Sequence, residues 1–417
     1  MPDGSAYRPL TVKYRECYCM TRSFTFQHTI RACYLGLVTE SIIGNLVPLL
    51  FLIFRARFGL DLTQVMLLTT LNFIVQLAVD LIAAFVVDKL GYRVCTFGGH
   101  IFVAVGLCGL GIFPFVLRNA YAGLLLAVFL YAFGGGFIGA LISPIMEASP
   151  SDNKASAMSL LHSFACWGSV AVIFFSTAFL QIFGENSWRV LCILWALLPI
   201  CNACLFAKVP LRMLPGEKGN RAFVSLLKTP IFWLFMLMMV VSGASEYSMS
   251  QWASAFAESG LHISKLAGDI CGPCFFAVMM GFSRIFYGKR GQNIDLLRFI
   301  LLSAALCVGA YLLTSFSPLP ILSLLGCGMV GLSVGILWPG VFSIAVKTLP
   351  QGGTALFALL SVGGSLGCTA GSTLVGTVSR NHGDDLHFGL LAAVIFPLLM
   401  LFFASYLKRF YHPEKKG

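Results

Sequence analysis

The sequence predicts an all-α membrane protein with twelve transmembrane helices in two six-helix halves. Of its 417 residues, 58% are hydrophobic and only 11% are charged, and the mean hydropathy is +0.86. The apolar residues form repeated stretches of about 20 residues, the length of helix that a bilayer core requires. A bilayer offers no partner to backbone N–H and C=O groups, so these stretches are expected to be helices.

The twelve predicted spans follow the apolar stretches in chain order. A longer polar interruption, which includes Pro210 and Pro215, separates the sixth span from the seventh. It divides the chain into a tail at 1–29, a first half at 30–208, a linker at 209–229, a second half at 230–407 and a tail at 408–417. The spans are expected at residues 30–54, 63–87, 94–117, 120–145, 156–182, 189–208, 230–257, 266–286, 294–316, 319–346, 354–379 and 385–407.

The basic residues predict the orientation of these helices. If both termini are cytoplasmic, most of the 28 Lys and Arg residues fall in the tails and short loops on the cytoplasmic side, as the positive-inside rule requires. The net charge of +11 is then a topology signal, so no nucleic-acid partner is expected. We therefore expect a multi-pass, monomeric protein of the plasma membrane, with the lipid bilayer as its surroundings.

The two halves resemble each other at an offset of about 200 residues. The loop at 88–93 corresponds to 288–291, and the start of the fifth span at 157–163 corresponds to the start of the eleventh at 355–361. Two six-helix repeats related by an axis along the membrane normal are a known transporter plan, with the substrate bound between them near mid-depth.

Several of these segments resemble those of a known family. The loop Asp-Lys-Leu-Gly-Tyr-Arg at 88–93 resembles the D-R/K-x-G-x-R loop of the major facilitator superfamily. Shorter segments resemble its fucose–galactose–glucose:proton symporter branch, which implies proton-coupled transport of a sugar. These segments are 134–136 with Ser143-Pro144, 160–164, and 243–246 followed by Trp252.

The chain departs from that branch at two positions. The resemblance implies an acid on the fourth helix, about five residues before an Asn-Pro pair, but this chain has Gly139 at that position and the pair is Ser143-Pro144. The first-helix acid, Glu40, also stands farther from its helix proline, Pro48, than in those relatives. The identity of the solute and the site of proton coupling therefore stay open.

Acids inside the predicted spans are candidates for proton coupling. Glu40 lies about ten residues into the first span, roughly 15 Å deep at 1.5 Å per residue. A charged group at this depth is costly, so a retained one usually faces a cavity or a partner. Asn72, Gln76 and Asp80 follow one stripe of the second span. We expect Glu40 and Asp80 to couple protons; the alternatives are a structural carboxyl at Glu40 and a gate residue at Asp80.

The seventh span concentrates polar groups that suit a polar solute. Its residues 242–252 offer an acid, an amide, hydroxyls and aromatic rings within about three turns. The alternative is a serine-lined seam between helices with Trp252 as an interfacial anchor, and for His162 a structural imidazole or a proton relay. The residues expected to hold the solute are Glu246, Tyr247, Gln251, Trp252, Gln76, Asn72, His162 and Trp338.

The expected function is secondary active transport by alternating access. The candidate gate residues are Asp88, Gly91 and Arg93 in the first repeated loop and Arg284 in the eighth span. Motifs for nucleotide hydrolysis, zinc proteolysis or serine hydrolysis do not occur, so we expect neither an enzyme nor a metal or cofactor site. The cargo is expected to be a small polar solute such as a sugar, carried with protons. The alternatives are proton-driven efflux of amphipathic compounds and a non-transporting membrane sensor.

Overall fold

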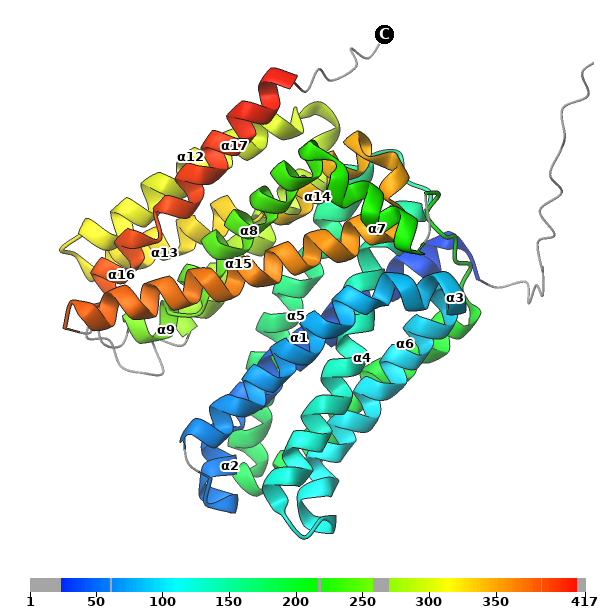
Figure 1. Ribbon diagram of the computed structural model, residues 1–417. Helices are drawn as coiled ribbons and strands as arrows, with labels where there is room; N and C mark the ends of the chain where they lie inside the picture. Colours follow the sequence, from blue (N-terminus) through cyan, green and yellow to red (C-terminus); the bar gives the residue numbers. More distant parts are fainter. Residues whose placement is uncertain (1–23, 61, 217–218, 258–269, 384, 411–417) are drawn as a thin grey trace, which may run out of the picture.

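The computed structural model describes residues 24–60, 62–216, 219–257, 270–383 and 385–410, and all regular structure in these ranges is helical. Most of the predicted N-terminal tail, through residue 23, lies outside them. The helices form two groups that follow the two halves of the chain (Figure 1). The first group consists of α1 (Phe26–Leu49), α2 (Phe51–Phe58), α3 (Leu62–Val116), α4 (Ala120–Ala148), α5 (Lys154–Phe183) and α6 (Trp188–Lys208).

The second group is built in the same way, and the short helix α7 (Gly219–Lys228) lies within the predicted linker before it. Several of its predicted spans are interrupted: the chain turns after Ser250, at Gly335 and near Ala393. The second group consists of α8 (Pro230–Ser250), α9 (Ala253–Ala255), α11 (Phe275–Arg290), α12 (Leu296–Phe316), α13 (Pro320–Val334), α14 (Leu337–Thr348), α15 (Gly353–Asn381), α16 (Leu386–Ala392) and α17 (Ile395–Phe410).

Ten helices among the described residues are long and apolar enough to cross a membrane. The second predicted span appears as a shorter apolar stretch, Leu67–Ala83, within α3. The eighth corresponds to α11, while residues 266–269 of that span lie outside the described ranges. Large side chains such as those of Phe174 and Leu302 are 65% and 69% exposed, as expected of groups that face lipid. The full count of twelve stays a prediction.

The glycines at 134–136 explain how three helices converge on α4. A Cβ on Gly134 would meet the carbonyl oxygen of Gly99 in the third predicted span. One on Gly135 would stand 3.0 Å from Gln76 Nε2 and 3.4 Å from Glu40 Oε1, and one on Gly136 would stand 2.6 Å from Val79 Cβ. These positions carry no side chains. The helix α1 and the parts of α3 before and after Gly91 can therefore approach the α4 backbone closely. This packing brings Glu40 and Gln76 together.

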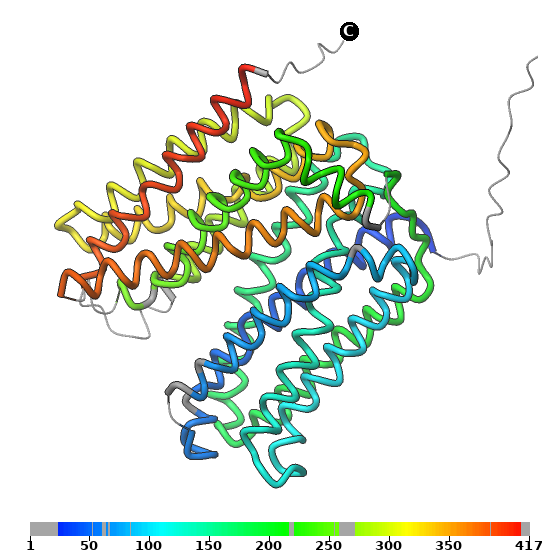
Figure 2. The backbone as a smooth tube through the Cα atoms, viewed as in Figure 1, coloured from blue at the N-terminus to red at the C-terminus, as the bar shows by residue number. Residues whose placement is uncertain are grey.

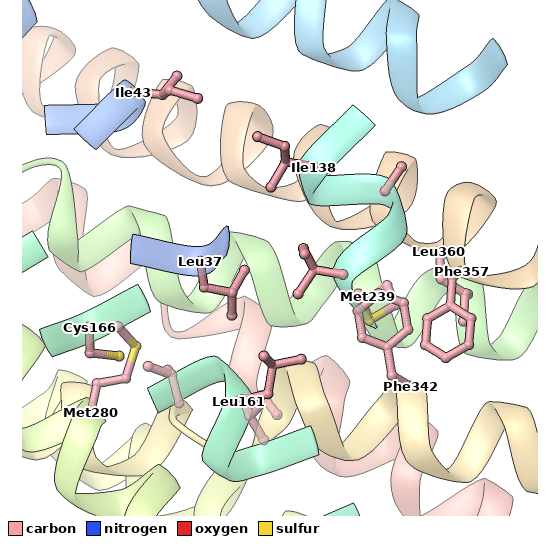
Figure 3. Close-up of a cluster of buried hydrophobic side chains, with 14 of the residues drawn as sticks. Leu37, Ile43, Ile138, Leu161, Cys166, Met239, Met280, Phe342, Phe357 and Leu360 are labelled. Atoms are coloured by element: carbon pink, nitrogen blue, oxygen red, sulfur yellow. The ribbon is translucent and has the colours of Figure 1, made fainter. Parts of the chain in front are cut away.

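The halves contact each other near one end, which we call the basic end because it carries the 88–93 loop, α7 and Lys289-Arg290. There Tyr92 Oη lies 2.6 Å from Thr354 Oγ1. The Phe85 ring stacks on that of Phe223 in α7, with 4.3 Å between the ring centroids. Figures 1 and 2 show the halves diverging toward the opposite end, where α2 and α16 lie far apart. Closer to mid-depth the halves share buried apolar side chains. Figure 3 shows Cys166 of α5 beside Met280 of α11.

We expect both chain termini and the 88–93 loop to lie on the cytoplasmic side. The reason is the concentration of Lys and Arg at the basic end, which favours retention on that side. Reporter fusions at the C-terminus and within the α12–α13 turn near Leu319 will measure this, the second fusion serving as the opposite-side control. An external reporter signal from the C-terminus would contradict the expected orientation.

Candidate functional site

Glu40 of α1 lies in a polar cluster inside the first half. Its carboxyl packs against the glycine face of α4, and Gln76 Nε2 adjoins the same face and donates to Asn72 Oδ1 at 3.3 Å. Asp80, one turn of α3 beyond Gln76, is 8% exposed. The Oε1 atom of Glu40 is fully buried and has no hydrogen-bond partner among the described residues. The cluster therefore contains an acid with an unused acceptor.

Gly139 stands where the family resemblance implies an acid on the fourth helix, and in the structure it lies beside Glu40. A Cβ on Gly139 would stand 3.9 Å from Glu40 Cδ and 4.0 Å from Oε1. The Glu40 carboxyl of α1 is therefore within ordinary van der Waals distance of the position that a Cβ at residue 139 would occupy.

In the second half, Glu246 of α8 pairs with Arg284 of α11. Glu246 Oε2 lies 3.3 Å from Arg284 Nη2, and the two side chains are 14% and 5% exposed. Arg284 also donates from Nε to the Gly335 carbonyl at 2.9 Å. A buried cation requires such compensation, since desolvation of an unpaired charge costs several kcal/mol. Arg284, a gate candidate of the eighth span, thus forms an ion pair with Glu246.

His162 of α5 contacts side chains of both halves. In the second half, Tyr247 follows Glu246 on α8 and is partly buried. His162 Nε2 lies 3.3 Å from Ser143 Oγ, and its ring stacks on Phe342 of α14 at 6.2 Å. His162 therefore belongs to the region in which the two halves meet.

Trp167 of α5 is a further candidate site residue that the sequence motifs did not indicate. Its Nε1 is buried without a hydrogen-bond partner in the described part of the chain, 3.2 Å from where a Cβ on Gly281 would stand. Its ring meets Phe282 edge-on at 5.5 Å. Its depth in the fifth span was the only sequence signal. A buried indole N–H with no acceptor is a donor that a solute hydroxyl could satisfy.

Two residues predicted to bind the solute, Gln251 and Trp252, lie away from Glu246, whereas Trp338 lies in ring contact with Phe342, which also contacts His162. Gln251 is exposed beyond the end of α8. Trp252 donates from Nε1 to the Ser372 carbonyl at 3.0 Å and packs against Gly376 of α15. Trp338 packs over Gly364 of α15 and meets Phe342 edge-on at 6.3 Å. The structure therefore does not bring Gln251 and Trp252 together with Glu246.

The 88–93 loop is organised by its glycine and its arginine. Gly91 has a φ of 81°, a left-handed value that reverses the chain between the second and third spans. Arg93 donates to the carbonyls of Phe206 at 3.0 Å and Val209 at 2.8 Å, and so caps the end of α6. Asp88 is half-buried at the start of the loop. The loop therefore holds Tyr92 where it meets the second half.

We expect Tyr92→Phe to shift the protein toward opening at the basic end. The variant loses only the hydroxyl that bonds Thr354 across the halves, and one such bond is worth about 1 kcal/mol, or about a fivefold change in the equilibrium. Cross-linking between the halves at this end measures the shift. Thr354→Val is the matched change on the other side. If the double variant shifts by the sum of the two single effects, the bond does not hold the halves together.

The described residues contain no group of three or more His, Cys, Asp or Glu side chains arranged to hold a metal ion. Comparison with known proteins adds the family. The model of the Major Facilitator Superfamily matches residues 33–372. The chain belongs to this superfamily. It is therefore an integral membrane transporter and not an enzyme, and its fold is the major facilitator fold.

Solved structures of other Major Facilitator Superfamily members share this fold across almost the whole chain. The fucose:proton symporter FucP of E. coli matches with a TM-score of 0.78 at 14% identity, covering 91% of this chain and 98% of that one. The proton:xylose symporter XylE matches with a TM-score of 0.75 at 12% identity, covering 92% and 95%. The human organic anion transporter MFSD10 matches with a TM-score of 0.70 at 15% identity, covering 92% and 100%. Comparison with curated sequences finds no significant match.

Proposed function

We propose that this transporter moves a small polar solute, such as a sugar, across the plasma membrane together with protons. The observation that carries the proposal is Glu40, whose buried carboxyl has an acceptor atom without a partner in the described structure. It lies beside the amide of Gln76, which is one turn of α3 away from Asp80. A carboxyl in this position can take up a proton, while the neighbouring amides can bind solute hydroxyl groups.

The roles follow from where the side chains lie. Glu40 and Asp80 exchange the proton, since both are acids of the first half within the membrane. Glu246, Tyr247, Gln76 and Asn72 bind the solute, because they carry the polar atoms on the two sides of the region between the halves. His162, Trp338 and Trp167 form its aromatic wall.

Alternating access explains the shape of the molecule. The halves meet at the basic end and diverge at the other (Figure 1). If the basic end is cytoplasmic, this is an outward-facing state, and FucP, one of the structural neighbours, is described in an outward conformation. The 88–93 loop and Tyr92 then close the inner side, and the monomer completes the cycle by rocking its halves.

The test is uptake into proteoliposomes that contain the purified protein. Radiolabelled monosaccharides, amino acids and nucleosides are screened with an inward proton gradient, and internal pH is followed with a dye. We expect one class to accumulate against its gradient and to acidify the vesicle interior as it enters. Accumulation that persists after the proton gradient is collapsed would overturn proton coupling, and accumulation confined to amino acids or nucleosides would overturn the sugar assignment.

A second candidate is proton-driven efflux of amphipathic compounds, including organic anions. It is favoured by the aromatic groups at the site, where His162, Phe342 and Trp338 lie in ring contact, and by the fold shared with the organic anion transporter MFSD10. The same vesicles decide between the two, because efflux would appear as movement of an aromatic anion toward the acidic side with no sugar uptake.

A further inference from the structure

Arg284 is bonded to both halves of the transporter at once. Within its own half, Nη2 contacts Glu246 at 3.3 Å and Nε donates to the Gly335 carbonyl at 2.9 Å. Across the halves, Nη1 donates to the His162 carbonyl at 3.0 Å and contacts Cys166 Sγ at 3.1 Å. Each nitrogen of the guanidinium therefore has a partner, and the residue is only 4% exposed.

The contacts across the halves belong to a seam between α5 and α11. Ser159 Oγ donates to the backbone carbonyl of Arg284 at 2.8 Å. Nearer the basic end, a Cβ on Gly288 would stand 3.1 Å from Leu160 Cβ, and Ser156 Oγ donates to the Tyr287 carbonyl at 3.4 Å. Arg284 is the only charged side chain of this seam for which the structure shows both an ion pair in one half and hydrogen bonds to the other.

The guanidinium of Arg284 transmits a movement of Glu246 to the contacts with α5, because it is planar and rigid. Its Nη1 and Nη2 atoms are held in one plane, so a movement of Glu246 that draws Nη2 away also moves Nη1 from the α5 backbone. A lysine in the same place keeps the charge but has a single ammonium group. It cannot hold Glu246, Gly335 and the α5 groups at the same time.

We propose that Arg284 is a positioning residue that holds the α5–α11 seam closed in this state and ties the seam to Glu246. Opening of the basic end separates α5 from α11 and breaks the bonds to His162 and Cys166. The bond to Glu246 survives, because both residues belong to the half that moves as one body. The binding region on α8 and the closure between the halves are thereby coupled through one side chain.

The test is hydrogen–deuterium exchange of the solute-free protein, so it needs no identified cargo. In Arg284→Lys we expect exchange at the seam, in residues 154–167 and 281–290, to rise about tenfold, the change produced by about 1.4 kcal/mol. Exchange near the opposite ends, in residues 176–183 and 372–381, is expected to fall. This reciprocal pattern reports rocking, whereas simple loss of stability would raise exchange everywhere.

Two further variants sharpen the result. Cys166→Ala removes one contact across the halves and should shift exchange the same way by a smaller factor, while Cys166→Ser keeps an acceptor and should restore the wild-type pattern. Arg290→Gln, on the exposed end of α11, is the charge control and should change neither region. Unchanged exchange, or a uniform rise, in Arg284→Lys would overturn the assignment. If that variant does not fold, a wild-type pattern in Cys166→Ala would overturn it.

Discussion

Replacing Glu40 with Gln is expected to abolish proton-driven accumulation of the solute while leaving exchange of solute across the membrane intact. Gln has nearly the same size and fits against Gly135 and Gly139, but its amide neither takes up nor releases a proton. With one proton per solute, each pH unit supports about tenfold accumulation, since 1.4 kcal/mol corresponds to a factor of ten. The variant should lose this factor and stop at equal concentrations on both sides.

The measurement is the ratio of internal to external solute at a fixed pH gradient, together with solute exchange at equal pH. Glu185→Gln is the matched control, because Glu185 is exposed in the turn before α6. Asp80→Asn tests the second acid of the cluster. If Glu40→Gln accumulates solute like the wild type, the coupling acid is Asp80 or Glu246 and the role given to Glu40 is wrong.

The second large effect is expected for Glu246→Gln. The change leaves the buried Arg284 without its anionic partner, and breaking a buried pair in this way costs about 3–5 kcal/mol. Loss of a side chain that binds the solute costs a further 1–3 kcal/mol of binding free energy. This weakens solute binding about 5- to 150-fold. We expect both a lower unfolding temperature and a higher dissociation constant for the solute.

A double variant separates these two effects. Glu246→Gln combined with Arg284→Gln removes both charges, so stability should recover in large part while affinity should not. Ser245→Ala is the control on α8: its hydroxyl donates only to the Val241 carbonyl of its own helix, and its effect should be mild. Wild-type affinity in Glu246→Gln would move the binding site to Glu40, Gln76 and Asn72 in the first half.

Much of the architecture follows from local patterns in the sequence. The lengths of the apolar stretches determine where helices lie, because lipid allows the backbone no other way to satisfy its polar groups. The predicted spans begin and end within a few residues of the observed helices for α4, α5, α6, α12 and α15. The spans at 230–257 and 319–346 were predicted as continuous stretches, since the apolar content does not change at the turns after Ser250 and at Gly335.

In the candidate site, too, the sequence selects some residues, whereas only the structure shows their partners. The sequence alone selected Glu40, Asp80 and Glu246, because an acid within an apolar span is costly wherever the helix packs. It did not determine their partners. Arg284 was predicted as a gate residue from its depth along the eighth span, and the structure adds its ion pair with Glu246. Gln251 and Trp252 follow Glu246 in the chain but lie in the turn that ends α8.

The tertiary structure decided these partners because they depend on how helices cross. Glu40 meets Gly139 only where α1 crosses α4 over the glycines at 134–136, and Arg284 reaches Cys166 only where α11 lies along α5. A crossing angle results from the packing of many side chains on two helices. A residue's depth in the membrane can be read from its own helix, but its neighbour across a crossing depends on the other helix as well.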